Sequence, residues 1–157
     1  MILRPATPAD AQAIAIVHRT AMRVSLSFLP DLHTAAEDLR YFSEKFLPAN
    51  AVWVADEAGQ VVGYVGFDAD WINHLYVLPE FQGQGTGPRL LAKAMADGRS
   101  RRLWTFQQNA RARKFYEARG FVAVAFTEGE GNEEKTPDVC YEWRACSGLV
   151  TEARSGA

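Results

Sequence analysis

The chain has 157 residues, a length typical of one domain. Hydrophobic residues make up 48% of it and charged residues 23%, a composition that excludes an intrinsically disordered chain. The formal net charge is −2, which argues against a general nucleic-acid binder. The sequence has no apolar run of roughly 18–20 residues, so we expect no membrane span.

The first half of the chain predicts a strand, two helices and three strands. Thr7 is suited to cap the first helix, and Thr34 with Glu37 forms a capping box for the second. In the second helix Leu39, Phe42 and Phe46 are expected to face inward, and Pro48 to follow its end. The predicted elements are a strand over 2–4, helices over 7–23 and 34–47, and strands over 51–56, 60–68 and 71–78.

The second half adds a glycine-rich loop, two helices and three strands. The predicted order is a loop over 81–87, a helix ended by Gly98, a strand over 103–106, a helix over 110–119 and strands over 121–126 and 139–144. The strand–helix–strand step over 71–106 predicts two parallel strands, whereas the others are expected to be antiparallel. The fold class is therefore α/β, with a mixed, mostly antiparallel twisted sheet and helices on both faces.

Two cysteines, Cys140 and Cys146, bear on compartment and metal binding. On one strand they would lie about 20 Å apart, too far for a disulfide. The sequence has no CxxC pair or Cys/His cluster, so we expect no metal. The amino-terminal residues lack the pattern of a secretory signal, which favours a cytoplasmic protein with two structural thiols.

The stretch Gln82–Gly87 contains three glycines between a predicted strand and a predicted helix. Backbone N–H groups of such a loop can hold a phosphate. A nucleoside-triphosphate loop would end in Gly-Lys-Ser/Thr, but Gly87 is followed by Pro88 and Arg89. A dinucleotide fingerprint would need its third glycine at Pro88. The pyrophosphate of coenzyme A and a tight turn without ligand remain as alternatives.

Two spaced motifs resemble the GNAT superfamily of acetyl-coenzyme-A-dependent N-acetyltransferases. The family signature Gln/Arg-x-x-Gly-x-Gly/Ala after a strand is matched by Gln82, Gly85 and Gly87. The family's Asn…Phe-Tyr-Glu-x-x-Gly-Phe is complete over Asn109–Phe121. The resemblance covers about residues 1–144, which we expect to form the acetyltransferase domain, with 145–157 as a frayed tail. It implies the acyl-CoA N-acyltransferase fold and acetyl-CoA as co-substrate.

The resemblance also implies which residues hold the coenzyme. The expected cofactor-binding residues are Leu75, Tyr76, Val77, Gln82, Gly83, Gln84, Gly85, Thr86, Gly87, Pro88, Asn109, Phe115 and Tyr116. Asn109 and Tyr116 are seven residues apart and so share one helix face, about 10 Å apart along the axis. We expect Tyr116 to give a proton to the departing thiolate. Alternatively, Asn109 only caps its helix and Tyr116 is a core residue.

The acceptor amine must attack in its neutral form, and His74 on the central strand is a candidate base. A core or surface histidine is an equal alternative. The expected substrate-binding residues are Phe28, His33, Trp71 and Glu134. Acidic residues over 127–144 favour a cationic amine. Some protein-acetylating members carry a glutamate where this chain has Trp104, which disfavours ribosomal-protein or N-terminal peptide acceptors.

The leading hypothesis is an N-acetyltransferase that transfers the acetyl group directly to a primary amine, a small molecule. No cysteine lies near the motifs, so we expect no acetyl-enzyme. The alternatives are a catalytically weak coenzyme-A-binding sensor and a transferase acting on a protein lysine or N-terminus. We expect no nucleic-acid or membrane partner. Members of the family are often dimers, so a homodimer stays among the expected partners.

Overall fold

The computed structural model describes residues 1–145, and the predicted tail from residue 146 onward, with Cys146, lies outside the described residues. The strands are β1 (Ile2–Pro5), β2 (Ala51–Glu57), β3 (Gln60–Phe67), β4 (Ile72–Val77), β5 (Arg101–Phe106), β6 (Val122–Thr127) and β7 (Asp138–Trp143). The helical segments are η1 (Pro8–Asp10), α1 (Ala11–Ser25), α2 (Ala35–Tyr41), η2 (Phe42–Phe46), α3 (Leu47–Ala49), η3 (Pro79–Phe81), α4 (Thr86–Ala94) and α5 (Ala110–Glu117). The predicted order of elements is confirmed.

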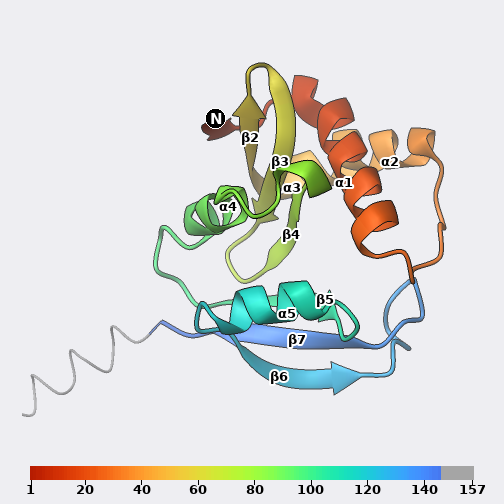
Figure 1. Cartoon of the computed structure of the whole chain (residues 1–157), viewed down its shortest axis with the longest axis vertical. Coiled ribbons are helices and arrows are strands. Elements are labelled where there is room, and N and C mark those ends of the chain that lie inside the picture. Colours follow the sequence, from red (N-terminus) through yellow and green to blue (C-terminus); the bar gives the residue numbers. More distant parts are fainter. Residues whose placement is uncertain (146–157) are drawn as a thin grey trace, which may run out of the picture.

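The strands form two sheets that meet at one point. The first has the order β1-β2-β3-β4 and the second the order β5-β7-β6, with antiparallel pairing throughout. A single parallel bridge between Trp71 and Arg102 joins them at the start of β4 and β5. The predicted parallel orientation of these two strands is confirmed, but beyond the bridge they diverge. Figure 1 shows the first sheet above and the second sheet below, with a V between them.

Helices cover the first sheet from both sides, as the sequence predicts. Helix α1 packs on β3 and β4 with the buried stripe Ile14, Val17 and Ala21. Helix α4 packs on β2, β3 and β4 from the other side and buries Leu90 and Leu91. In Figure 1, α1 and α2 lie to the right of this sheet and α4 to its left, while α5 lies along the second sheet.

The second helical segment is longer than predicted and is not a regular helix. Its capping box is confirmed, because Thr34 Oγ1 accepts from the Glu37 N–H at 3.1 Å and the Glu37 carboxylate accepts from the Thr34 N–H at 2.9 Å. The helix continues to Ala49, so Pro48 lies inside its last turn and the predicted end before it is wrong.

The inward face of this segment is carried by a π-helical turn over Phe42–Phe46. Phe42 and Phe46 are buried as predicted. Leu39 is 38% exposed, so its predicted inward orientation is wrong. A π-helical turn contains an extra residue, which rotates the preceding helix face away from the direction of the two phenylalanines.

Candidate active site

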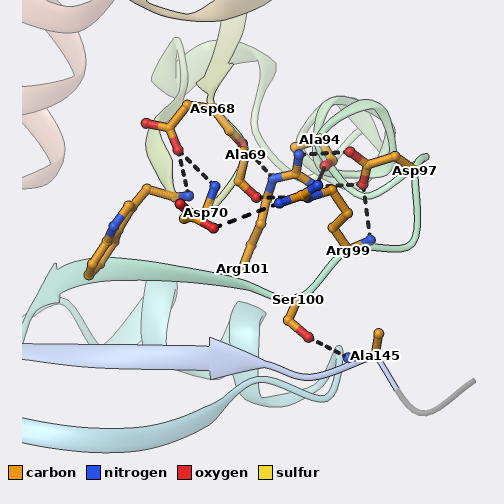
Figure 2. A network of polar contacts seen from close by, with 10 residues as sticks. Asp68, Ala69, Asp70, Ala94, Asp97, Arg99, Ser100, Arg101 and Ala145 are labelled. Carbon is orange, nitrogen blue, oxygen red and sulfur yellow. Dashed lines mark hydrogen bonds and ion pairs between the residues drawn. The ribbon is translucent and has the colours of Figure 1, made fainter. Parts of the chain in front are cut away.

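The point where the two sheets meet is fixed by the side chain of Arg101, which is 3% exposed. Its guanidinium donates to both carboxylate oxygens of Asp97 at 2.6 and 2.9 Å. It also donates to the carbonyls of Ala94 and Asp68, both at 2.8 Å. Figure 2 shows that one side chain thus joins the end of α4, the β3–β4 turn and the start of β5. The V between β4 and β5 opens from this junction.

A cleft of about 400 Å³ lies between the end of β4, the glycine-rich loop and α5, and we call it the glycine-loop cleft. Gly83 and Gly85 in its wall have φ values of +78° and +85°, a conformation that other residues rarely adopt. The side chain of Gln82 donates to the Val77 carbonyl at 3.0 Å and so ties the loop to the end of β4. The loop backbone therefore borders the cleft without an intervening side chain at these two glycines.

Most of the residues expected to hold the coenzyme line this cleft. Those present are Leu75, Tyr76, Val77, Gln82, Gly83, Gly85, Gly87, Pro88, Asn109, Phe115 and Tyr116. Gln84 and Thr86 do not line it. The Gln84 amide donates to the Glu80 carbonyl, and Thr86 is 1% exposed with its hydroxyl against the Met1 sulfur. Thr86 begins α4, which turns its side chain into the body of the protein.

Asn109 and Tyr116 stand at the two ends of α5. The Asn109 carboxamide oxygen accepts from the Ala112 N–H at 3.1 Å, so Asn109 does cap its helix. Tyr116 is 8% exposed, and within residues 1–145 its hydroxyl has no hydrogen-bond partner. Burial raises the pKa of Tyr116 above its usual value, so the phenol stays protonated. A protonated phenol in the wall of a cleft can donate a proton or a hydrogen bond.

Two basic residues that the motif did not assign also line the glycine-loop cleft, namely Arg111 and Arg119. Arg119 stacks on the Phe115 ring at 3.9 Å and donates to the Phe115 carbonyl at 2.9 Å. The spacing of Ala112, Phe115, Tyr116 and Arg119 is i, i+3, i+4, i+7, a helical stripe that could have identified Arg119. The other four arginines between residues 99 and 119 face elsewhere: Arg99 to Asp70, Arg101 to Asp97, Arg102 to Glu142 and Arg113 to Tyr141.

A second cavity, of about 1010 Å³, lies on the α1 and α2 side of β4, and we call it the aromatic cavity. It shares Leu26 and Tyr76 with the glycine-loop cleft, so the two spaces adjoin. Its inner wall is formed by His18, Tyr41, Phe42, His74 and Tyr76. Its acidic lining residues are Asp31, Glu37, Asp38, Glu130, Glu133, Glu134 and Asp138.

The arginines of the aromatic cavity are paired with its carboxylates. Arg19 contacts Asp38 at 2.8 Å and Asp31 at 3.6 Å, and Arg23 contacts Asp31 at 2.7 Å. In the described lining, the remaining acidic residues outnumber the remaining basic residues. The cavity is therefore acidic around its opening.

His74 lies in the inner wall, held by three neighbouring rings. Its Nδ1 is 2.9 Å from the Tyr64 hydroxyl, and its ring stacks on Phe46 at 4.4 Å and on His18 at 5.1 Å. Burial, and then the neighbouring His18, lowers the pKa of His74 well below its usual value. Burial likewise lowers the pKa of His18 to about 4. Both imidazoles are therefore neutral at neutral pH.

The structure brings two of the four predicted substrate residues to this cavity. His33 and Glu134 line it, and His33 also contacts Glu133, which joins the α1–α2 loop to the β6–β7 loop. Phe28 is not in the lining and packs on the Phe106 ring at 6.1 Å. Trp71 is not in the lining either and forms the bridge to β5. The structure therefore does not bring these two residues into the lining of the aromatic cavity.

His18 and Tyr41 are lining residues that the sequence analysis missed. His18 follows the core residue Val17, and Tyr41 precedes the core residue Phe42. Each therefore lies at the edge of the buried face of its helix. Trp104, named for its departure from a family pattern, also lines the cavity.

Comparison with known proteins identifies the family of this chain. A profile of the acetyltransferase (GNAT) domain matches residues 48–123. An uncharacterized N-acetyltransferase of Archaeoglobus fulgidus is 35% identical over 102 residues, which span 54% of this chain and 69% of the relative. The L-amino acid N-acyltransferase MnaT of Escherichia coli is 28% identical over 141 residues, or 80% of this chain and 81% of the relative. The chain belongs to the GNAT family of N-acetyltransferases.

A solved structure extends the likeness to the whole fold. The PaiA N-acetyltransferase of Thermoplasma acidophilum, solved in complex with coenzyme A, superposes with a TM-score of 0.72. The match covers 91% of this chain and 98% of that protein at 18% sequence identity. At this identity the likeness concerns the fold alone. The predicted fold class and family are both confirmed.

The described residues contain neither a candidate membrane span nor a candidate metal-binding group. No helix between residues 1 and 145 is long and apolar enough to cross a membrane. In the same part of the chain, no group of three or more His, Cys, Asp or Glu side chains is placed to hold a metal ion.

Proposed function

We propose that this protein, through an acetyltransferase domain spanning residues 1–144, transfers the acetyl group of acetyl-CoA to the primary amine of a small cationic molecule. The observation that carries the proposal is that two cavities adjoin at Tyr76 and Leu26, one beside the glycine-rich loop and one with an acidic lining. A thioester in the first and an amine in the second would meet beside β4. Acetyl-CoA is a co-substrate here, and no metal takes part in the proposal.

The glycine-loop cleft fits the coenzyme in shape and charge. The left-handed Gly83 and Gly85 bring backbone N–H groups to the wall next to the start of α4, where a pyrophosphate is favoured. Arg111 and Arg119 supply positive charge in the same lining. β4 is the edge strand of its sheet, so its outer backbone groups are available to an extended pantetheine arm.

The proposed chemistry is direct attack. The amine nitrogen attacks the thioester carbon, the carbon–sulfur bond breaks, and the leaving thiolate takes the phenolic proton of Tyr116. Water restores that proton, and the excess proton of the new amide passes to solvent. The raised pKa of Tyr116 keeps its proton in place until the thiolate forms. His74, in the inner wall of the aromatic cavity, contacts the acceptor in this proposal.

The acceptor class follows from the lining of the aromatic cavity. Seven acidic side chains line it, and its two arginines are already paired with Asp31 and Asp38. An acceptor with a carboxylate next to its amine would be repelled, whereas a diamine or an aralkyl amine would be attracted. The His33–Glu133 contact closes the rim between two loops, which supports a small acceptor over a polypeptide segment.

A thiol-release assay with acetyl-CoA and a panel of amines tests the proposal. The panel holds diamines, aralkyl amines, L-amino acids and a lysine peptide, and we expect the first two groups to be used best. Tyr116→Phe should lower turnover at least about tenfold without changing the affinity for coenzyme A. Tyr141→Phe is the matched control, because Tyr141 is also buried but bonds to Arg113 and Glu117 instead of lining either cavity.

Each other outcome has a distinct meaning. Equal turnover by Tyr116→Phe and wild type would contradict the acid role of Tyr116. Acetylation of the lysine peptide alone would make the acceptor a polypeptide. Coenzyme binding without acetylation of any amine would make the protein a sensor.

A further inference from the structure

The ring of His74 is built into one orientation by residues from three elements. Tyr64 on β3 reaches Nδ1 at 2.9 Å, Phe46 stacks at 4.4 Å and His18 on α1 stacks at 5.1 Å. Gly66 lies directly opposite His74 in the β3–β4 register. A Cβ on Gly66 would lie 2.6 Å from Cε1 of Phe46, so the glycine is what admits the phenylalanine against the imidazole.

The hydrogen bond between Tyr64 and His74 has a defined direction. Tyr64 is 0% exposed, and in the described part of the chain its hydroxyl has His74 Nδ1 as its one partner. Burial raises the pKa of Tyr64, so the phenol keeps its proton. Leaving that buried O–H without an acceptor would be unfavourable, because its hydrogen bond to water is lost on burial. The hydroxyl therefore donates and Nδ1 accepts.

This direction decides where the other proton of the imidazole sits. A ring nitrogen that accepts a hydrogen bond carries no hydrogen, so a neutral His74 carries its hydrogen on Nε2. Across residues 1–145, His18 Nδ1 is the single side-chain nitrogen or oxygen that is both enclosed and without a partner. Nε2 of His74 also lacks a partner there and is therefore not enclosed. It borders the aromatic cavity, which His74 lines.

From this geometry we infer that Tyr64 is a positioning residue that fixes His74 as the Nε2–H tautomer, so that His74 offers the acceptor a hydrogen-bond donor. The inference deepens the proposed function and rests on it for the identity of the acceptor. It gives His74 a different role from the base that the sequence predicts. In this tautomer Nε2 has no lone pair with which to take a proton from the amine.

In the absence of a base, the uncharged groups that surround the bound amine favour the loss of its proton. The titratable groups around His74 are His18 from α1, Tyr41 from α2, Tyr64 from β3 and Tyr76 from β4. All are neutral at pH 7, since the pKa of His18 falls to about 4 and that of Tyr76 rises to about 12. A cationic amine drawn in by the exposed carboxylates enters an uncharged inner wall, which lowers its own pKa. Its proton leaves to water.

Nuclear magnetic resonance of the imidazole nitrogens tests the inference directly. Long-range ¹H–¹⁵N correlation spectra of the labelled full-length protein distinguish the two neutral tautomers. We expect His74 to be the Nε2–H form in the wild type and a mixture of forms in Tyr64→Phe. Tyr141→Phe, which also removes a fully buried hydroxyl, should leave the His74 signals unchanged. A wild-type Nδ1–H tautomer, or no change in Tyr64→Phe, would overturn the inference.

Kinetics supply a second readout that separates donor from base. His74→Gln keeps an N–H donor and should stay within about tenfold of wild-type kcat/KM, whereas His74→Ala should lose about 100-fold. Tyr64→Phe should lower kcat/KM for the amine about tenfold with no change in acetyl-CoA affinity. Equal losses in His74→Gln and His74→Ala would restore the base. If the wild type acetylates no amine, the proposed function fails, while the tautomer spectra still decide the role of Tyr64.

Discussion

Replacing Arg101 by methionine should destabilise the protein more than the same replacement of a basic residue in the neighbouring β3–β4 and α4–β5 turns. Arg101 is 3% exposed and gives hydrogen bonds to Asp97, Ala94 and Asp68 (Figure 2). Methionine fills most of the same space but donates no hydrogen bond. The Asp97 carboxylate is 46% exposed and regains water, so its loss of a partner is small.

The two backbone carbonyls set the magnitude. The Ala94 and Asp68 oxygens would each lose their 2.8 Å donor inside the junction between the sheets. An unsatisfied buried acceptor costs about 1–3 kcal/mol, so Arg101→Met should lose about 2–6 kcal/mol of the free energy of unfolding. For a domain of this size about 2–4 °C of Tm corresponds to 1 kcal/mol, which gives a fall of about 4–24 °C.

Thermal unfolding followed by circular dichroism measures this fall, with Arg99→Met as the control. Arg99 belongs to the same network in Figure 2, but its side chain is 58% exposed, and it has one exposed hydrogen bond, to the Ala69 carbonyl at 3.2 Å, and an Asp70 oxygen 3.9 Å away. Its loss should cost less than about 0.5 kcal/mol. If Arg101→Met shifted Tm no more than Arg99→Met, the claim that this side chain holds the two sheets together would be refuted.

Two further changes test the loop and the amino-terminal ion pair. Gly85→Glu should abolish coenzyme A binding in calorimetry, whereas Gly98→Glu, which strains an equally left-handed glycine outside the cleft, should leave it unchanged; weakened binding in both would remove the specific role of the loop. Arg4 lowers the pKa of Asp10 to about 2, below the value of about 3.9 in the unfolded chain. The Arg4–Asp10 pair therefore stabilises the folded state fully above about pH 4, and this contribution is lost as the pH falls to 2. The urea unfolding midpoint of Asp10→Asn should therefore change less with pH over that range than the midpoint of a variant of the exposed Glu44. An equal pH dependence of the two midpoints would contradict the linkage.

Local signals explain what the sequence predicted well. The Thr34 capping box depends on neighbouring residues only and appears as expected. Gly98 does adopt a left-handed φ of +72°, but α4 already ends at Ala94, so the predicted end of this helix at Gly98 is wrong. The two motifs identify the family because they combine local loop geometry with a helix face. The lining of the glycine-loop cleft was predictable for the same reason, except at Gln84, which bonds to the Glu80 carbonyl, and at Thr86, where α4 begins and turns the side chain inward.

Contacts between distant segments explain what could not be predicted. The large aromatic side chain of Trp71 suggested a pocket wall, but the pairing of this residue with Arg102 across the V depends on how the two sheets meet. Phe28 and Phe106 are far apart in the chain, and their contact depends on the path of a loop. The Tyr64–His74 bond likewise needs the β3–β4 register, which no short pattern contains.

One strand, β4, contributes to both cavities. Asn73 and His74 line the aromatic cavity, Leu75 and Val77 line the glycine-loop cleft, and Tyr76 lines both. A shift of β4 by one residue against β3 would turn its side chains to the opposite face and bring the imidazole to the wrong side. Phe46 packs closely over Gly66 on β3 and stacks on His74 on β4 at 4.4 Å, so it holds these two opposite residues together and opposes such a shift. The same phenylalanine packs on the ring that Tyr64 orients, so the register of β4 and the orientation of its histidine depend on one cluster of contacts.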